Sequence, residues 1–307
     1  MADFVTPYYS INDFYRKRFG EKIRKIPVTI ADDCPNRRGL KGMETCVFCD
    51  VWGSAAYEDQ KGQSLKDQIQ THMHGLAAKH NCKSFLIYFQ SYTSTFLGTK
   101  TLRKHFDEAL SVPEVKGFVI GTRPDCVSQA VLELWNEYEA KCFVSVELGV
   151  QSFYEDQIRF LRRGHSAKQS IEVIKKIKAH SNVDLGVHLI FGIPGETDSD
   201  IIETAKLISS LPIDNVKLHN LHVLKNTPLE KLYENAEFTP IELDEYTRRV
   251  GIFLQYLNPD IAIHRLAAVS SRWEELVAPQ WTRFHLKTYE FIKTSLLTQG
   301  IKQGQLI

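Results

Sequence analysis

The sequence lacks the features of a membrane or secreted protein. It contains no run of about 18 apolar residues that would cross a bilayer, and no basic start followed by an apolar stretch of signal-peptide length. These absences predict a cytoplasmic protein that does not span a membrane. Internal repeats, low-complexity tracts and long linkers are also absent, which argues against a repeat architecture.

The net charge is small, and the chain has few cysteines. The formal net charge is only +1, which gives little global attraction to nucleic acid. Six cysteines in 307 residues are better explained as thiols or metal ligands than as a disulfide framework, because the cytosol keeps thiols reduced. With 43% hydrophobic residues the chain can bury a sizeable core, and a single α/β domain with a small appendage fits best.

Positive charge concentrates in one segment, Asn12 to Ile26, where basic residues outnumber Asp13 and Glu21. The basic residues are Arg16, Lys17, Arg18, Lys22, Arg24 and Lys25. Such a run is typical of a solvated helix face, and phosphate binding is the alternative that the charge pattern leaves open.

Short β-branched and aromatic runs alternate with longer amphipathic segments, which is typical of parallel strands joined by crossover helices. The expected strands are Pro27–Ala31, Ser84–Gln90, Gly117–Gly121, Cys142–Gly149, Leu185–Gly192 and Asn215–Leu221, with a further short strand at Ile261–Arg265. Apolar residues at three- and four-residue spacing predict helices at Ser64–Lys79, Lys100–Leu110, Val127–Tyr138, Ala167–His180, Asp198–Ser210 and Leu243–Tyr256.

Three cysteines directly follow the first expected strand. Cys34, Cys46 and Cys49 form a C-x11-C-x2-C pattern, which is one ligand short of a closed tetrahedral metal site. A metal held there would keep an open coordination position. The spacing alone fits an iron–sulfur cluster and a zinc site completed by His72 or His74 equally well.

Polar residues follow the other expected strands. The segments are Gln90–Thr95, Gly121–Asp125, Glu147–Ser152, His188–Thr197 and Lys217–His222. Since the loops after the strands of a βα barrel share one face, these residues are predicted to converge on one mouth together with the cysteines.

In this order, the strand-end segments resemble the radical S-adenosylmethionine (SAM) superfamily, in the branch that includes the Elongator catalytic subunit and oxygen-independent coproporphyrinogen oxidase. The resemblance covers nearly the whole chain and is closest to a short bacterial subfamily labelled YhcC-like or YtqA-like. In the cysteine loop Arg38 replaces the usual Asp, and Glu44-Thr45 replaces the usual Gly-Gly. The block His264-Arg265-Leu266 resembles the subfamily's tail, but Ala267-Ala268-Val269 follows instead of Thr-Gly-Asp.

The resemblance implies a partial (β/α)6 TIM-like barrel over residues 1–238, followed by an α-rich extension over residues 239–307 that covers the open side. It also implies an enzyme in which the three cysteines hold a [4Fe-4S] cluster and the fourth iron binds SAM. Reductive cleavage of SAM would give a 5′-deoxyadenosyl radical, with an electron donor such as flavodoxin or ferredoxin. The implied cofactor contacts are Phe48, Gln90, Ser91, Thr93, Thr122, Arg123, Glu147, Ile190, Lys217 and His219.

For several of these residues, a purely structural role is the alternative to a contact with the cofactor or substrate. Glu147 would serve equally as a strand-end carboxylate paired with Arg123. Lys217 and His219 are favoured as substrate or cofactor contacts because they lie on the loop face. Cys82, Cys126 and Cys142 have no paired spacing, so burial as small apolar groups explains them, with Cys126 also a candidate for facing the mouth.

The remaining polar candidates are explained first by structure. His188 and His264 are expected to be hydrogen-bonded core residues, since a lone histidine on a strand is more often a core residue than a catalyst. For His222, a core role and a contact with substrate or cofactor are about equally expected. Arg162 to His165 form a basic loop that more simply ends a helix. Pro194-Gly195 would form a turn before a helix capped by Thr197 or Asp198.

The resemblance favours tRNA as the substrate, because Elongator-like relatives modify wobble uridines and a branch of the short subfamily is associated with trimming a carboxymethylaminomethyl side chain to an aminomethyl one. Hydrogen abstraction beside the amine, oxidation and imine hydrolysis would be a radical route. A small-molecule metabolite is the alternative substrate. A non-catalytic, metal-supported protein-binding scaffold is the alternative of another class.

Overall fold

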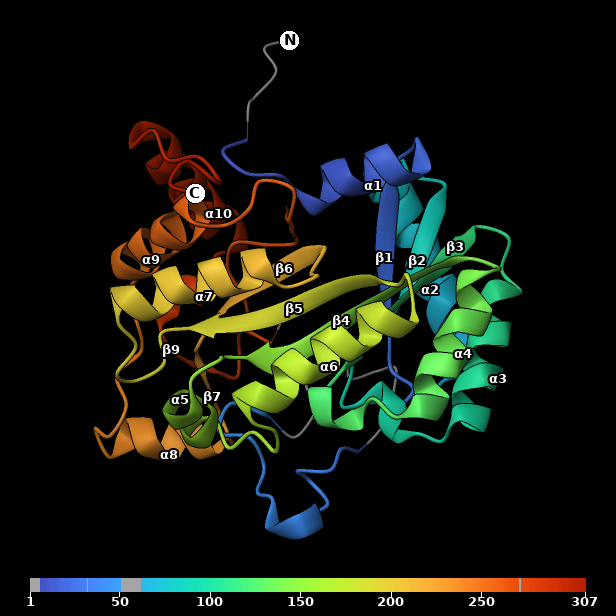
Figure 1. Ribbon diagram of the computed structural model, residues 1–307, viewed down its shortest axis with the longest axis horizontal. Coiled ribbons are helices and arrows are strands. Elements are labelled where there is room, and N and C mark those ends of the chain that lie inside the picture. Colours follow the sequence, from blue (N-terminus) through green and yellow to red (C-terminus); the bar gives the residue numbers. More distant parts are fainter. Residues whose placement is uncertain (1–5, 32, 51–61, 271) are drawn as a thin grey trace.

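The computed structural model describes residues 6–31, 33–50, 62–270 and 272–307. Its centre is a curled sheet of parallel strands in the order β1-β2-β3-β4-β5-β6-β8 (Figure 1). The strands are β1 Ile23–Val28, β2 Ser84–Phe89, β3 Val115–Thr122, β4 Phe143–Gln151, β5 Asp184–Phe191, β6 Asn215–Asn220 and β8 Ala262–Ile263. A small antiparallel pair, β7 Val223–Leu224 and β9 Leu276–Ala278, lies apart from this sheet.

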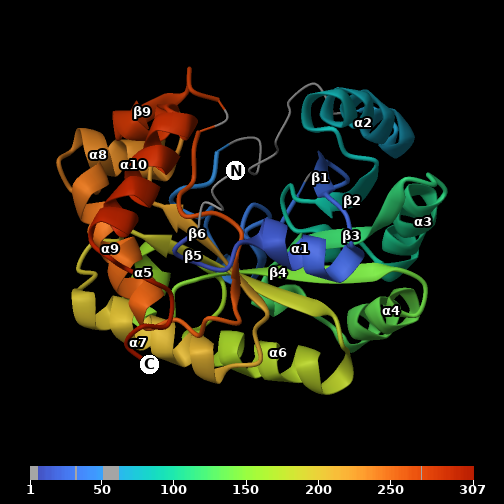
Figure 2. The same ribbon diagram turned by 90° about the horizontal axis from the view of Figure 1, so that it is seen from above.

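Helices cover the outer face of the sheet, and α2, α3, α4, α6 and α7 follow one another around it in chain order (Figure 2). The α-helices are α1 Ile11–Phe19, α2 Leu65–His80, α3 Thr99–Leu110, α4 Gln129–Glu139, α5 Glu155–Phe160, α6 Ala167–His180, α7 Asp198–Ser210, α8 Pro228–Glu234, α9 Leu243–Gln255 and α10 His285–Thr298. This is the predicted partial TIM-like barrel, and the further short strand expected near its end is present as β8.

Hydroxyl side chains start most of the crossover helices. Ser64, Ser128 and Ser166 each accept the backbone N–H of the third helical residue, which satisfies one of the free donors at a helix start. Thr197 forms a capping box with Asp200, whose side chain accepts the Thr197 N–H at 2.8 Å. The expected turn before this helix is confirmed, with Gly195 at φ 78°.

The core lies between the sheet and the outer helices. Every residue of β2 is buried, as expected for a central parallel strand. Phe106 of α3 stacks on Phe118 of β3 with ring centroids 4.6 Å apart, and Tyr138 of α4 meets Phe106 edge-on at 5.1 Å. This packing fixes the strands and therefore the positions of their carboxyl ends.

The segment after residue 239 shares this core. Tyr246 and Phe253 of α9 are fully buried in the main apolar cluster, and α9 packs against α7. Ser10 pairs with Ile263 beside β8, so the chain before α1 lies along the free edge of the sheet. The proposed division between residues 238 and 239 stays a prediction.

The expected bounds of the first strand were wrong. Gly20, at φ 71°, ends α1 by donating its N–H to the carbonyl of Arg16, and β1 begins at Ile23. The basic segment is therefore a helix followed by a strand, not one solvated helix face. Its residue Lys25 lies on β1 and points to Glu147, with 2.6 Å between Nζ and Oε1.

Within the described part of the chain, no helix has the length and apolar character needed to cross a bilayer.

Candidate active site

A cavity of about 400 Å³ opens at the carboxyl ends of the strands. All but one of the predicted cluster and cofactor residues line it; the exception is Ser91, whose buried hydroxyl has no hydrogen-bond partner. Residues from the segment after β8 complete the wall, namely Arg265, Ala268, Val269, Ser270 and Arg272. The strand-end loops therefore converge on one mouth, as the sequence predicts, and the C-terminal segment closes one side of it.

Each cysteine of the predicted cluster loop receives an N–H donor. The backbone N–H of Arg37 points to Cys34 Sγ at 3.5 Å, and the Arg37 guanidinium points to Cys49 Sγ at 3.6 Å. Arg163 donates to Cys46 Sγ at 3.1 Å. Such donors stabilise negative charge on sulfur, which a metal-bound thiolate carries. Burial, together with the neighbouring Cys46, raises the pKa of the Cys49 thiol to about 11.

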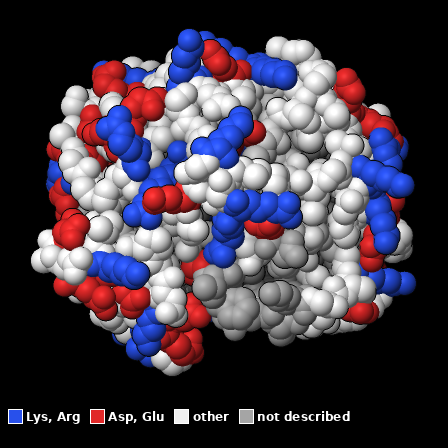
Figure 3. All heavy atoms as spheres, turned by 90° about the horizontal axis from the view of Figure 1, so that it is seen from below, with Lys and Arg blue, Asp and Glu red and all other residues white. Residues whose placement is uncertain are grey.

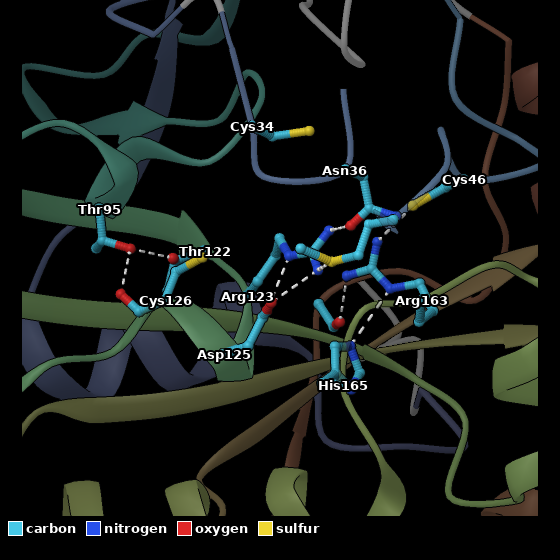
Figure 4. Close-up of polar contacts among 12 residues, drawn as sticks. Cys34, Asn36, Cys46, Thr95, Thr122, Arg123, Asp125, Cys126, Arg163 and His165 are labelled. Carbon is cyan, nitrogen blue, oxygen red and sulfur yellow. Dashed lines mark hydrogen bonds and ion pairs between the residues drawn. The ribbon is translucent and has the colours of Figure 1, made fainter. Parts of the chain in front are cut away.

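Arg123 and the loop after α5, Glu155–Phe160, hold the cysteine loop in place through Asn36 (Figure 4). Arg123 after β3 donates to Asn36 and to both oxygens of Asp125, at 2.8 and 2.9 Å. Asn36 in turn donates to the carbonyls of Glu44, at 2.6 Å, and Arg162, at 2.8 Å. The alternative pairing of Arg123 with Glu147 is therefore wrong, because Arg123 fastens the cysteine loop.

The basic loop from Arg162 to His165 also packs on the cysteine loop. Besides Cys46, Arg163 donates to the carbonyl of Gly149 at 2.9 Å and contacts His165 at 3.4 Å. Burial lowers the pKa of His165 to about 3, so its ring is neutral. Gly164 lies so close to the loop that a Cβ there would be 2.1 Å from Met43 Sδ and 2.6 Å from the Arg123 guanidinium. This loop therefore does more than end a helix.

The three other cysteines are apart from the cavity lining. The carbonyl of Cys126 accepts a hydrogen bond from Thr95 at 2.8 Å, and the Thr95 hydroxyl also contacts Thr122. Burial raises the pKa of the Cys126 and Cys142 thiols to about 12. Both are therefore protonated, and Cys82 is likewise buried.

The base of the cavity is built around Glu147, whose side chain is fully buried. Five groups of the described residues lie against its carboxylate: Lys25 Nζ at 2.6 Å, Tyr88 OH at 2.6 Å, His188 Nε2 at 2.6 Å, Lys217 Nζ at 3.0 Å and His264 Nδ1 at 3.5 Å. The first four come from β1, β2, β5 and β6, and His264 directly follows β8. Glu147 on β4 thus ties most of the sheet together from the inside.

Burial and charge act in opposite directions in this network. Burial alone would raise the pKa of Glu147, but the charges of Lys217 and Lys25 bring it well below the usual range. Burial lowers the pKa of Lys217 to about 7, even though Glu147 opposes the change. Burial and the charge of Lys217 lower the pKa of His188 to about 4. At neutral pH the network therefore contains a carboxylate, a neutral His188 and a lysine that titrates.

Arg265 is a cavity residue to which the sequence assigned no role. Its guanidinium Nη2 contacts His219 Nδ1 at 2.7 Å, and the ring of His219 lies 5.0 Å from that of His188. Burial and the charge of Arg265 lower the pKa of His219 well below its usual range, so the imidazole is neutral and accepts this hydrogen bond. The quoted block His264-Arg265-Leu266 contained the signal, because it overlaps the carboxyl end of the last expected strand, Ile261–Arg265.

The histidines proposed for a zinc site lie elsewhere. His74 on α2 contacts the carbonyl of Gln70 at 2.9 Å, and neither His72 nor His74 lines the cavity. In residues 6–31, 33–50, 62–270 and 272–307, no group of three His, Cys, Asp or Glu residues is placed to hold a single metal ion. Three cysteines along one cavity wall, each facing an N–H donor, suit a cluster that binds each thiolate through a different iron.

Comparison with known families agrees with this geometry. Residues 28–208 match the model of the radical SAM superfamily, and residues 213–297 match that of the radical SAM C-terminal domain. The chain belongs to the radical SAM superfamily. It is therefore an enzyme of the class that uses a [4Fe-4S] cluster and SAM, and the scaffold alternative is not supported.

Similar full-length relatives occur in bacteria and archaea. This radical SAM enzyme is 34% identical to protein YhcC of Escherichia coli over 86% of its own length and 84% of that protein. It is 35% identical to protein MJ0486 of Methanocaldococcus jannaschii over 95% and 89% of the two chains. Protein YtqA of Bacillus subtilis is 29% identical over 97% and 92%. The resemblance to the YhcC-like and YtqA-like subfamily is thus confirmed.

More distant relatives belong to the Elongator branch. The structure of Elp3 from Methanocaldococcus infernus superposes with a TM-score of 0.68 at 17% identity, over 92% of this radical SAM enzyme and 64% of the other chain. The tRNA uridine(34) acetyltransferase of the same organism is 25% identical over 66% of this chain and 35% of its own length. The first comparison shows a shared fold.

Proposed function

We propose that this radical SAM enzyme modifies the side chain of a wobble uridine in tRNA, using a cluster held by Cys34, Cys46 and Cys49. The observation that carries the proposal is that these cysteines share one cavity with a polar base built from several strands. When bound, the reduced cluster and SAM supply a 5′-deoxyadenosyl radical that abstracts hydrogen from a substrate carbon.

In this proposal, the residues of the chain hold and orient the cluster and SAM. Arg37 and Arg163 neutralise charge on the cluster thiolates, and Arg123 keeps the cysteine loop in register through Asn36. Phe48 and Ile190 supply apolar surface in the cavity for the adenine. Gln90 and Thr93, which line the cavity after β2, would hold the methionine end of SAM, and Thr122 would lie near its carboxylate or ribose. A contact from Ser91, which does not line the cavity, stays a prediction from the resemblance.

Among the predicted cofactor residues, Glu147 and Lys217 lie together at the base of the cavity. Glu147 reaches the cavity surface only at its base, where Lys25, Tyr88, His188 and Lys217 surround its carboxylate. A contact between Glu147 and a ribose hydroxyl of SAM would require one of these groups to give up its place on the carboxylate, because both oxygens are already contacted. Lys217 and His219 face the space where substrate and SAM would meet.

Support for tRNA comes from the relatives and from the surface. One distant relative is named for acetyl transfer to tRNA uridine 34. Lys and Arg side chains gather near the middle of the face on which the cysteine loop lies (Figure 3), and Arg38, Lys41 and Arg162 are exposed in the loops of that face. These cations would contact phosphates.

An aromatic patch adjoins the cavity wall and would suit unpaired bases. Trp273 and Phe284 are about half exposed, at 49% and 48%. Arg283 lies over the Trp273 ring at 4.2 Å, and Trp273 directly follows the cavity residue Arg272. Exposed rings beside a guanidinium can stack bases of a single-stranded loop such as an anticodon loop.

The test is the modified-nucleoside profile of bulk tRNA from the native host after disruption of the gene. We expect one wobble-uridine derivative to disappear and its precursor to accumulate, with carboxymethylaminomethyluridine as the precursor favoured by the subfamily. A plasmid copy of the wild type should restore the profile, as should Cys82→Ala, whereas Cys46→Ala should not. An unchanged profile would contradict a tRNA role and favour a small-molecule metabolite as substrate.

The enzyme also needs a one-electron donor. A small redox protein such as flavodoxin or ferredoxin would dock on the basic face near the cysteine loop, since such donors are commonly acidic and electrostatic attraction favours their encounter. This assignment is part of the proposal.

A further inference from the structure

Pairing of charges around the cavity leaves one guanidinium without a carboxylate. Arg123 is paired with Asp125, Arg272 with Asp50, and Lys25 and Lys217 share Glu147. Arg163 faces the cluster cysteine Cys46. In the part of the chain that the structure describes, Arg265 alone among the arginines lining the cavity has neither a carboxylate nor a thiol as its partner.

The contacts of Arg265 do not compensate its charge. Its Nη2 lies 2.7 Å from Nδ1 and 3.2 Å from Nε2 of His219, which is neutral. Its Nε is buried and has no hydrogen-bond partner. An unsatisfied buried donor on a charged group is costly, so the site favours an anion that would complete its hydrogen bonds.

The residues around Arg265 indicate which kind of anion would bind to it. Lys217 is a second basic side chain in the same cavity, with its Nζ on Tyr88 at 2.8 Å and on Glu147 at 3.0 Å. Ala268 and Val269 add apolar surface to the same cavity. A planar carboxylate on a short chain matches the flat fork of a guanidinium better than a bulky phosphate in this enclosed corner.

We propose that Arg265, beside Lys217, binds a carboxylate of the substrate at the base of the cavity. The proposal rests on the proposed function insofar as the carboxylate belongs to a wobble-uridine side chain. Arg265 would then determine specificity, because a side chain ending in a carboxylate would be bound and one ending in a neutral or cationic group would not. Its place is on the substrate, not on the methionine carboxylate of SAM.

The first arm of the test measures binding without turnover. The probe is N-methylglycine, which has the secondary amine and carboxylate of the carboxymethylaminomethyl group, and the control is its carboxamide. Saturation-transfer NMR is recorded on cluster-loaded enzyme with SAM present and no reductant. We expect transfer to N-methylglycine in the wild type, roughly tenfold weaker transfer in Arg265→Gln, and little transfer to the carboxamide.

Two further variants serve as controls for the binding measurement. Arg265→Lys keeps the charge without the fork and should bind with intermediate strength. Arg248→Gln removes an exposed arginine that is paired with Asp198 and should behave as the wild type. Equal signals for N-methylglycine and its carboxamide, or an unchanged signal in Arg265→Gln, would overturn the proposal.

The second arm identifies the source of the carboxylate. Equilibrium dialysis should give the same SAM affinity for wild type and Arg265→Gln, whereas roughly a tenfold loss would assign Arg265 to SAM and overturn the proposal. With tRNA carrying carboxymethylaminomethyluridine, Arg265→Gln should raise KM for 5′-deoxyadenosine release by about tenfold or more. If no RNA stimulates the wild type while N-methylglycine still binds through Arg265, the carboxylate site stands and the tRNA assignment fails.

Discussion

Glu147 shows at the scale of one residue how the cavity base depends on charge balance. Replacing it by Gln would leave Lys25 and Lys217 without their shared carboxylate. We expect Glu147→Gln to lower the free energy of unfolding by about 3–5 kcal/mol, as for other broken buried ion pairs. Guanidinium unfolding at pH 7 measures this, with the exposed Glu203→Gln as the control. Equal midpoints for the two variants would show that the network adds nothing to stability.

Titration of Asp184 should make the free energy of unfolding fall as pH rises, which is opposite to the effect of a carboxylate in an ordinary ion pair. Burial raises its pKa to about 7, although Ser145 donates to it at 2.6 Å. In the unfolded chain its pKa is about 3.9, so the folded protein binds the extra proton and stability from this group falls as pH rises from about 4 to 7. The fall should be complete above the folded pKa.

Asp184→Asn removes this titration. The change in unfolding free energy from pH 5 to pH 8 should be more positive in the variant than in the wild type, because the amide does not become charged and the fall due to Asp184 is lost. Comparing the two slopes cancels the contribution of Glu196, whose pKa burial also raises to about 7. Parallel slopes in wild type and variant would contradict the role of Asp184.

Gly164 tests the fastening of the cysteine loop. A methyl group there would collide with Met43 and the Arg123 guanidinium, so Gly164→Ala should displace the loop. We expect the variant to retain less than about half of the wild-type iron and sulfide after anaerobic reconstitution, since ligands held loosely bind metal more weakly. Gly75→Ala, on α2 with nothing within 4 Å of the added Cβ, should retain the full content. Full iron content in Gly164→Ala would show that the close contact is unimportant.

At the scale of elements, helix α9 fixes the segment after β5. Glu196 accepts the Gly192 N–H at 2.7 Å, and Arg249 of α9 donates to the same Glu196 oxygen at 2.5 Å. Gly192 lies within the segment from Ile190 to Pro194 that we expect to pack on adenine. The C-terminal part of the chain therefore supports the predicted SAM site through a buried ion pair.

Two adjacent arginines of α9 allow a matched test. Arg249→Gln removes the partner of the buried Glu196 and should weaken SAM binding by roughly tenfold, because the loop after β5 loses its anchor. Arg248→Gln breaks only an exposed pair with Asp198 and Glu245 and should leave SAM affinity unchanged. Equilibrium dialysis with SAM measures both. The same affinity in the two variants would mean that α9 does not support the site.

The predicted elements followed from hydrophobic pattern, and the errors have the same origin. β2 was found because the residues after Ser84 are apolar or aromatic, and the whole strand is buried. β1 was misplaced because Arg24 and Lys25 interrupt its apolar residues, and Lys25 is tolerated inside only through Glu147. α10 was missed since Leu286, Phe291 and Leu297 are exposed and blur the helical periodicity.

At the scale of the whole molecule, the site was predictable where it depends on topology. Parallel strands end on one face, so the cysteines and the strand-end polar residues had to meet. The partners of Glu147 were not predictable, because Lys25 is 122 residues away and nothing in its neighbourhood indicates an inward side chain. Arg265 was passed over because β8 has only two residues, and its place depends on how the following segment crosses the cavity.

The distribution of charge explains how a protein of net charge +1 could act on tRNA. Basic residues lie in the loops of the mouth face (Figure 3), where Arg38 pairs with Asp33 and Arg162 with Glu44. Acidic residues of the outer helices also pair with neighbouring cations. Local attraction at the mouth does not require a basic protein. The cavity base is reached from this face, so the surface and the predicted chemistry are on the same side.

The most direct test of the account is release of 5′-deoxyadenosine by anaerobically reconstituted protein with SAM and dithionite, with and without bulk tRNA that lacks the modification. We predict release that depends on Cys46 and rises several-fold with this tRNA, but not with tRNA that is already modified. No release from wild-type protein with an intact cluster would contradict the account.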